Sequence, residues 1–271
     1  MTVHDVSRAG TSGGVRLSLA GKTALVTGAG RGIGAGIVEV FLEAGANVIV
    51  NARTDTYLSK LVARLTPTHL GRIFYLTGDL ASAEGAAEFV IAAMSQVGDI
   101  DVLVNGVGDA IMGDLINNHG EPEADAQIRR NLDLNLMSAI HCTRLIGPSM
   151  IRRKRGRVIN LVGVIGGISG EAGLSVYAAG KAGLIGFTRS LAREWAPHGI
   201  TVNAIAPGVF PDRESIMDLQ QTAIGKSLLG RIPLGRFGDP RELGYLACYL
   251  ASDLAAYVTG QILAHDGGLS A

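Results

Sequence analysis

The chain has 271 residues, of which 47% are hydrophobic and 18% charged, and its formal net charge is zero. This is enough apolar material for one large core, and the charge balance gives no electrostatic reason to expect binding to nucleic acid or to an anionic membrane. No apolar run approaches the length of about 20 residues that a membrane-spanning helix needs.

Residues 1–16 are predicted to be a flexible tail that precedes a single domain over residues 17–271. The tail is small and polar and lacks the apolar core of a signal peptide, which favours a cytoplasmic protein. Cys142 and Cys248 lie within apolar helical patterns. Both are interpreted as buried thiols in a reducing compartment, with no disulfide and no metal-ligand spacing.

A glycine-rich turn, T-G-A-G-R-G-I-G over residues 27–34, follows the first predicted strand and opens a helical pattern. Glycines let the backbone turn sharply and approach a diphosphate, while the helix offers free amide N–H groups and the positive end of its dipole. Loops collect glycine anyway, but strand, turn and helix in this order predict nucleotide binding. The expected binding residues are Gly28, Gly30, Arg31, Gly32, Ile33 and Gly34.

Strands and helices alternate along the first half of the chain. Strands are predicted over residues 25–27, 46–51, 73–76 and 102–105, and helices near residues 33–44, 56–65 and 82–97. Short strands rich in Val, Ile and Leu, joined by helices, are typical of a parallel sheet that is covered on both faces. The predicted fold class is therefore α/β, a doubly wound sheet of the Rossmann type.

The end of the second strand indicates which dinucleotide is bound. A carboxylate at this point bonds the ribose of NAD, whereas an arginine suits the 2′-phosphate of NADP. Here the strand ends at Arg53, with no carboxylate before Asp55, and Arg31 of the glycine turn can supply a second charge to the same phosphate. The sequence predicts NADP(H) rather than NAD(H); the alternative is two solvated surface arginines.

Two further stretches are expected to contact the cofactor. Asp79, followed by Leu80, is interpreted as an acceptor for the adenine, although a helix N-cap would look the same. Asn105, Gly106 and Val107 end the fourth strand, where small residues let a cofactor pass close to the backbone.

One long helix is predicted from Glu123 to about Ile151, with Asn135 in its middle. Asparagine is a poor helix former, so this position needs a function; the structural alternative is that it caps a kink or bonds a neighbouring backbone. The basic run Ile151–Arg157 precedes the fifth strand, over residues 158–162. It is interpreted as a solvated turn, with a docking patch for an acidic carrier protein as the alternative.

Tyr177 and Lys181 open the next predicted helix and lie four residues apart, so they share one helical face. A lysine ammonium and a nicotinamide cation near a phenol both favour the phenolate and lower its pKa. A phenol of this kind can give or take the proton that accompanies hydride transfer.

The last third of the chain is expected to close over the nicotinamide. The sixth strand, residues 200–206, leads into Pro207, Gly208 and Val209, and residues 209–233 are loosely patterned, as in a mobile substrate lid. A helix begins at Asp239-Pro240, and the last strand covers residues 261–264. His265 follows it and is interpreted as a hydrogen-bonded structural residue rather than a catalytic one.

These motifs together resemble the short-chain dehydrogenase/reductase superfamily, especially its 3-oxoacyl-(acyl-carrier-protein) reductase-like branch. The resemblance covers residues 19–269 and rests on the glycine turn, Asp79, residues 105–108, Asn135, Tyr177 with Lys181, Pro207-Gly208 and residues 266–268. It implies a seven-stranded parallel sheet and a homotetramer, or a dimer. It also implies that Tyr177 is the acid/base, that Lys181 binds the nicotinamide ribose, and that Asn135 holds a water that links Lys181 to solvent.

The sequence departs from the family at the catalytic serine. Gly163 stands at that position, so a substrate carbonyl loses one hydrogen-bond donor, a loss that can cost about 3 kcal/mol of barrier. Ser169 or Ser175 is expected to substitute, or the substrate brings its own polar group. A smaller departure, Asn105-Gly106, is expected to open space or to add flexibility under the cofactor.

The leading hypothesis is an NADPH-dependent reductase of a small-molecule ketone (3-oxoacyl, cyclic or polyketide-like), with Tyr177 as the proton donor. An imine reductase and an NADP-dependent alcohol dehydrogenase are alternatives, and an acyl carrier protein is a further possible partner. A different class remains open, a catalytically idle NADP-binding sensor or subunit, which the loss of the serine would favour.

Overall fold

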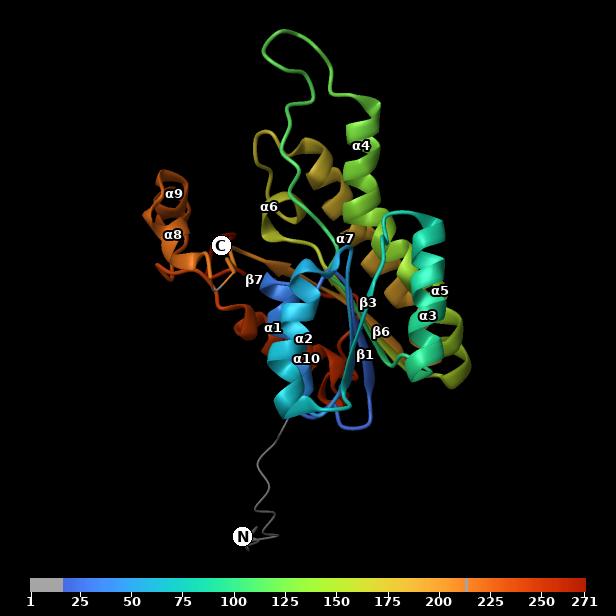
Figure 1. Ribbon diagram of the computed structural model, residues 1–271. Helices are drawn as coiled ribbons and strands as arrows, with labels where there is room; N and C mark the ends of the chain where they lie inside the picture. The colour runs from blue at the N-terminus through green and yellow to red at the C-terminus, as the bar shows by residue number, and fades with distance from the viewer. Residues whose placement is uncertain (1–16, 213) are drawn as a thin grey trace, which may run out of the picture.

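The computed structural model describes residues 17–212 and 214–271, so the predicted tail lies outside the described residues. Seven strands form one parallel sheet in the order β3-β2-β1-β4-β5-β6-β7 (Figure 1). The expected parallel sheet of seven strands is confirmed, and each predicted strand agrees within two residues. The strands are β1 (Thr23–Val26), β2 (Asn47–Ala52), β3 (Ile73–Thr77), β4 (Val102–Asn105), β5 (Gly156–Leu161), β6 (Ile200–Pro207) and β7 (Ile262–His265).

The strand order places the site. The chain leaves β1 toward β2 and β3 on one side, then returns to β4 on the other side of β1. Ligands of open parallel sheets bind where the order reverses, outside the carboxyl ends of the strands. In this sheet the reversal lies between β1 and β4, which are directly paired, and the glycine turn follows β1 there.

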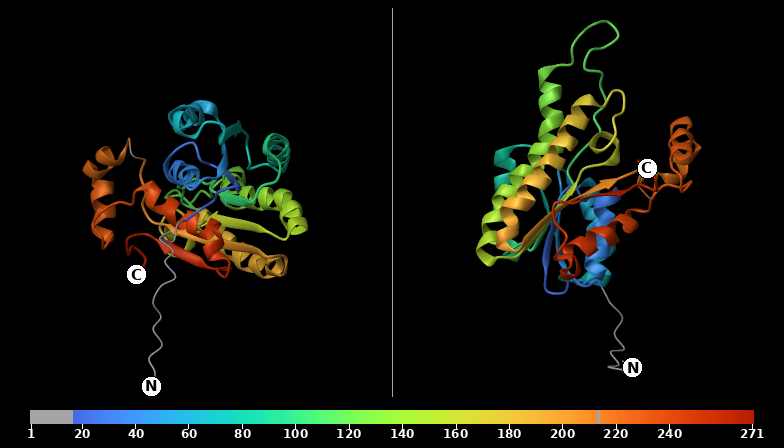
Figure 2. Two further views of the ribbon diagram at one scale, coloured as in Figure 1. Left: turned by 90° about the horizontal axis from the view of Figure 1, so that it is seen from below. Right: turned by 180° about the vertical axis from the view of Figure 1, so that it is seen from behind.

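Helices cover both faces of the sheet (Figure 1 and Figure 2). On one face α1 (Gly32–Glu43), α2 (Asp55–His69) and α10 (Pro240–Ala251) share a core with the strands. On the other face the core includes α3 (Ala83–Val97), α5 (Ser138–Arg153) and α7 (Ser175–Trp195). The five central strands are mostly apolar because both of their faces are largely buried, whereas the edge strands β3 and β7 are partly exposed. Shorter segments are α6 (Val164–Gly167), η2 (Ala196–His198) and η3 (Asp253–Ala255).

The predicted long helix over residues 123–151 is wrong as a single α-helix. It consists of α4 (Asp125–Leu132), a π-helical segment η1 (Asp133–Met137) and α5. A π-helical turn inside an α-helix is frequent at functional sites, and this one contains Asn135. The loop from β4 to α4 extends far from the sheet at the top of Figure 1.

The segment expected to form a lid contains two short helices, α8 (Ile216–Gln221) and α9 (Ala223–Arg231). They stand beside the carboxyl ends of the strands, apart from the two helical layers (Figure 1). Across residues 17–212 and 214–271, every helix is too short or too polar to span a bilayer.

Three arginines of the basic run 151–157, which leads into β5, form ion pairs within the chain. Arg153 and Arg155 both pair with Asp101, and Arg157 pairs with Asp253. The run contains a turn with exposed residues at Arg152, Lys154 and Arg155, as predicted, but three of its arginines also form ion pairs within the chain.

The two cysteines are free and buried, as predicted. Burial raises the pKa of the Cys142 thiol to about 12 and that of Cys248 to about 11. Neither thiol is therefore ionised near neutral pH, and neither is a reactive nucleophile.

Gly36 makes the crossing of α1 and α10 possible. A Cβ built on Gly36 would lie 2.4 Å from backbone atoms of Pro240, the first residue of α10. We expect Gly36→Ala to lower the free energy of unfolding by about 2 kcal/mol or more, because a helix backbone cannot move aside without repacking the core. Urea denaturation measures this change.

Gly230→Ala is the matched control for this prediction. Gly230 lies in α9, is exposed, and has no atom within 4 Å of a built Cβ. Alanine there should leave stability unchanged or slightly raised. Equal denaturation midpoints for the Gly36→Ala variant and the wild type would show that the α1–α10 contact is not tight.

Candidate active site

The glycine turn joins β1 to α1 and lies tight against the loop after β4. Gly28 has a φ of +64°, and a Cβ on it would lie 2.7 Å from the Gly106 carbonyl oxygen. A Cβ on Gly34 would lie 2.6 Å from the Cα of Ala29, so neither position accepts a side chain. Within the described residues, α1 has no side-chain hydrogen bond at its N-cap and no acidic residue in its first turn. Its amino end therefore suits an anion, and the Asp212 carboxylate already lies beside it, since a Cβ on Gly32 would lie 2.8 Å from Asp212 Oδ1.

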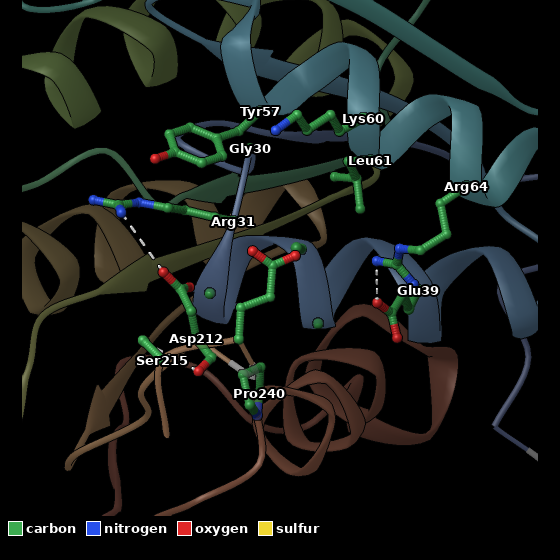
Figure 3. A pocket seen from close by; sticks show the side chains of 14 residues that line it. Gly30, Arg31, Glu39, Tyr57, Lys60, Leu61, Arg64, Asp212, Ser215 and Pro240 are labelled. Carbon is green, nitrogen blue, oxygen red and sulfur yellow. Dashed lines mark hydrogen bonds and ion pairs between the residues drawn. The ribbon is translucent and has the colours of Figure 1, made fainter. Parts of the chain in front are cut away.

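Arg31, in the same turn, points toward Asp212 and lies near Tyr57 of α2 (Figure 3). Its Nη1 is 3.6 Å from a carboxylate oxygen of Asp212, and its guanidinium carbon is 5.1 Å from the centre of the Tyr57 ring. A hollow of about 380 Å³, lined also by Gly30 and Lys60, lies beside it.

Arg53 follows β2 at the surface and lines a different hollow of about 520 Å³, together with Asp79. The sequence predicts that Arg53 and Arg31 bind the same phosphate. In the structure the two side chains line different hollows. The side chain of Arg31 is 65% exposed, so turning it toward Arg53 would break only its ion pair with Asp212 and its contact with Tyr57.

The alternative interpretation of Asp79 as a helix cap is wrong. The N-cap of α3 is Ser82, whose hydroxyl accepts a hydrogen bond from the Gly85 amide at 3.0 Å. Asp79 instead accepts from the Ala81 amide at 3.0 Å. Leu80 is 2% exposed and packs in the core, so only its backbone can contact an adenine.

The Asn105 side chain joins neighbouring elements of the fold, and contact of this residue with the cofactor stays a prediction. Its buried amide donates to Thr143 Oγ1 at 3.0 Å and to Asn160 Oδ1 at 2.8 Å, which ties β4 to α5 and β5. Gly106 does not open space under the cofactor, because a Cβ on it would lie 2.5 Å from the Thr27 carbonyl oxygen. Glycine is needed there for close packing. Val107 packs against the core on the α3 side of the sheet.

Tyr177 and Lys181 lie on one face of α7, near its amino end. The Lys181 side chain is buried, its Nζ donates to the Leu161 carbonyl at 3.0 Å, and it lies 5.8 Å from the centre of the Tyr177 ring. The carbonyl at the end of β5 thus fixes the lysine beside the phenol.

The pKa values of this pair depart from the sequence-based expectation. Burial, followed by the Asp109 carboxylate, raises the pKa of the Tyr177 phenol above its ordinary value, whereas a lowered pKa is expected from the sequence. Burial also lowers the pKa of Lys181 to about 8. Desolvation disfavours both charged forms. The chain's own groups therefore keep Tyr177 as a neutral phenol, able to donate a proton.

The Asn135 side chain forms hydrogen bonds with a neighbouring backbone segment. This is the structural alternative that the sequence analysis gives for Asn135. Its Nδ2 donates to the Asp109 carbonyl at 2.9 Å and to Asn131, and its Oδ1 accepts from the Asp109 amide at 3.1 Å. A Cβ on Gly108 would lie 2.7 Å from Lys181 Nζ and 2.8 Å from Asn135 Oδ1. The loop after β4 therefore passes between Asn135 and Lys181 with no room for a side chain.

Gly163 has a φ of +91°, which side chains rarely adopt. A Cβ on it would lie 3.2 Å from the Tyr177 hydroxyl oxygen. A serine would therefore be strained here. The backbone conformation at this position favours glycine, in addition to the sequence lacking a serine.

The serines expected to substitute do not reach the Tyr177 cavity. The Ser169 hydroxyl donates to the Val164 carbonyl at 3.3 Å, and neither Ser169 nor Ser175 lines the cavity. Asp109 does line it. Sequence reasoning missed this residue, although it directly follows the N-G-V-G stretch.

Pro207 and Gly208 line the same cavity, but Val209 lines a separate hollow of about 50 Å³ beside His265. The prediction that His265 is hydrogen-bonded through its side chain is wrong for Nδ1, which is buried without a partner among the described residues. Its ring instead packs edge-on against Phe210, with centroids 5.5 Å apart.

The glycine turn and the tyrosine–lysine pair meet in one open cavity of about 550 Å³. Of the predicted site residues, it is lined by Gly28, Arg31, Gly32, Ile33, Gly34, Gly106, Gly163, Tyr177, Lys181, Pro207 and Gly208. The predicted residues elsewhere are Gly30, Arg53, Asp79, Leu80, Asn105, Val107, Asn135, Ser169 and Val209.

Comparison with known proteins agrees with this geometry. Residues 28–270 match the sequence profile of the family described as enoyl-(acyl carrier protein) reductase. The 3-oxoacyl-[acyl-carrier-protein] reductases FabG of Vibrio cholerae and Staphylococcus aureus are each 37% identical, over 93% and 92% of this chain and 99% and 98% of theirs. The Pseudomonas aeruginosa RhlG/NADP active-site complex superposes with a TM-score of 0.83 at 35% identity, covering 93% of this chain and 98% of that one.

The chain has a parallel sheet, a glycine turn after its first strand, and a tyrosine–lysine pair in the cavity beside that turn. Its FabG relatives align with it over more than nine-tenths of its length. The chain belongs to the short-chain dehydrogenase/reductase family, in its 3-oxoacyl-(acyl-carrier-protein) reductase-like branch.

Proposed function

We propose that the chain is an NADPH-dependent reductase that converts a ketone to an alcohol, with Tyr177 as the proton donor. The observation that carries this proposal is the shared cavity, in which the Tyr177 phenol and the Lys181 ammonium face the glycine turn at Gly28 and Gly34. The FabG relatives are reductases of 3-oxoacyl groups, which supports a carbonyl as the reacting group.

NADP(H) is the cofactor, and it supplies the hydride when bound. The uncapped amino end of α1 and the side-chain-free glycines of the turn fit a diphosphate. Arg31 and Arg53 are the arginines that would bind the 2′-phosphate, and Asp79 would accept from the adenine. The RhlG complex, with NADP in its active site, supports this choice.

Each catalytic group has a defined task. Tyr177 is kept neutral by burial and by Asp109, so its hydroxyl can give a proton to the oxygen of the reacting carbonyl. Lys181, fixed by the Leu161 carbonyl, places a positive charge beside the phenol and stabilises the phenolate that proton transfer leaves. Asn135 acts as a positioning residue, because it holds both backbone groups of Asp109.

The alternatives have weaker support. An idle NADP-binding protein has no need for Tyr177, Lys181 and Asn135 all in place, and Arg31 and Arg53 favour NADPH-driven reduction over oxidation. An imine substrate needs less support for a developing oxyanion, so Gly163 keeps imine reduction as a second reaction to test.

We further propose a single cytoplasmic domain, assembled as a homotetramer, with residues 209–233 as the substrate lid. The FabG relatives support an acyl carrier protein as a partner, whereas the basic run gives limited support, because ion pairs within the chain engage Arg153, Arg155 and Arg157.

The loss of NADPH absorbance against a panel of ketones and cyclic imines tests the proposed function. We expect turnover with at least one ketone, and a much lower rate with NADH at equal concentration. NADPH binding without consumption across the whole panel would instead favour the idle binding protein.

A further inference from the structure

The cavity that holds Tyr177 also holds a carboxylate, Asp109, that neither gives nor accepts hydride or proton in the proposed reaction. Asp109 lies in the loop after β4 and lines the cavity together with Tyr177 and Gly163. Among the residues the structure describes, its carboxylate oxygens have no hydrogen bond and no ion pair. Asp109 is exposed in the open cavity, so water solvates its carboxylate, and an unpaired negative charge that lines a ligand site favours a positively charged group on the ligand.

The position of Asp109 is fixed from behind. Asn135, itself 1% exposed, accepts from the Asp109 amide and donates to the Asp109 carbonyl. The preceding residue, Gly108, leaves no space for a side chain between Asn135 and Lys181. Asp109 is exposed, but the buried Asn135 side chain bonds both its amide and its carbonyl, so the position of its backbone is constrained.

The other charges of the cavity are already engaged. Arg31 pairs with Asp212 at 3.6 Å, and Lys181 donates to the Leu161 carbonyl beside the Tyr177 ring. Asp109 is the one carboxylate left over among the described residues that line the cavity. Its charge reaches the catalytic phenol, since it contributes to the raised pKa of Tyr177.

Gly163 gives the second observation. The backbone there, at a φ of +91°, leaves the developing alkoxide without the hydroxyl donor that the family resemblance leads one to expect. An ammonium one carbon away from the carbonyl can donate to that alkoxide from within the substrate, and its positive charge matches Asp109. One substrate group would therefore account for both the missing donor and the unpaired carboxylate.

We propose that the substrate is a ketone with a protonated amine beside its carbonyl, and that Asp109 binds this ammonium. This inference rests on the proposed ketone reduction. Hydride from NADPH adds to the carbonyl carbon, the electron pair of the C=O π bond moves to oxygen, and Tyr177 gives that oxygen its proton. The ammonium keeps its protons, and the products are an amino alcohol and NADP⁺.

Three ketones that differ in one group test the inference: phenacylamine, propiophenone, and benzoylacetate, which carry an ammonium, a methyl and a carboxylate on the same carbon. We expect kcat/KM to be about tenfold or more higher for phenacylamine than for propiophenone, and lowest for benzoylacetate. In the Asp109→Asn variant the ratio of phenacylamine to propiophenone should fall about tenfold from its wild-type value, because only the intrinsic difference in reactivity between the two ketones remains.

Asp114→Asn is the matched control, because Asp114 is an exposed carboxylate on the same loop that does not line the cavity. It should leave the ratio unchanged. A wild-type ratio of one or less, or a ratio that survives in Asp109→Asn, overturns the inference.

Calorimetry separates the failure of this inference from the failure of the proposed function. The NADP⁺-loaded protein should bind phenylethanolamine more tightly than the isostere with a methyl in place of the ammonium, and Asp109→Asn should remove the difference. If propiophenone is reduced without a preference for phenacylamine, the inference fails and the reductase function stands. If no ketone is reduced, the reductase function fails, and equal binding of the two alcohols would then overturn the inference as well.

Discussion

Replacing Tyr177 by phenylalanine is expected to lower kcat for ketone reduction by about a hundredfold to ten-thousandfold. The phenol is the proposed proton donor, and neither of two neighbouring residues offers a replacement. Gly163 has no side chain, and Lys181 is bonded to the Leu161 carbonyl. Initial rates of NADPH consumption with the best ketone of the panel measure the effect.

Phenylalanine keeps the ring, so the packing of the site should not change. A Cβ on Gly166 would lie 2.6 Å from Tyr177 Cε1, which shows that the ring itself fills this space. NADPH affinity and the thermal unfolding midpoint should therefore equal those of the wild type. Full activity in the Tyr177→Phe variant, with intact cofactor binding, would rule out Tyr177 as the proton donor.

The fold could be predicted from local pattern because the strands are buried on both faces. Runs such as 47–52 and 200–207 contain little but apolar residues, and helical spacing lies between them. Such a sequence has few alternatives to a covered parallel sheet. The glycine turn could also be predicted from the sequence, because its geometry requires glycine. A Cβ on Gly28 or Gly34 would lie too close to the neighbouring backbone.

Polar residues inside the fold could not be assigned in this way. Asn105 and Asn135 both have the spacing of family site residues, yet the partners of Asn105 are Thr143 and Asn160, far away in the sequence. Asn135 bonds the backbone of Asp109, also from a distant segment. The chemistry of an amide depends on which groups the tertiary structure brings to it, and sequence spacing does not contain that information.

The environment of Tyr177 shows the same limit. The spacing of Tyr177 and Lys181 indicates that they are neighbours, but the sign of the pKa shift depends on burial and on Asp109. Likewise, the sequence indicates that Gly163 lacks a hydroxyl, whereas its φ of +91° comes only from the structure. The motifs therefore predict the reaction class, and the details that select a substrate require the geometry.

Replacing both Arg31 and Arg53 by glutamine is expected to lower kcat/KM for NADPH about a hundredfold and to leave kcat/KM for NADH nearly unchanged. In the proposed site, each arginine would donate charge-assisted hydrogen bonds to the 2′-phosphate, and each such bond contributes about 1.5–3 kcal/mol. NADH lacks this phosphate, so it gains nothing from either guanidinium. Binding of Arg31 to the phosphate must also replace its ion pair with Asp212, which is 3.6 Å long and exposed enough to be weak.

The control for this double variant removes two positive charges near the amino ends of the strands, opposite the proposed cofactor site. Arg152 and Lys154 are exposed and precede the amino end of β5, whereas Arg31 and Arg53 follow the carboxyl ends of β1 and β2. Arg152→Gln with Lys154→Gln should leave the NADPH to NADH ratio unchanged, because long-range effects of surface charge are screened over about 10 Å. A strong preference for NADPH in the Arg31, Arg53 variant would mean that other groups bind the 2′-phosphate. Lys60, which lines the hollow beside Arg31, would then be the next residue to replace (Figure 3).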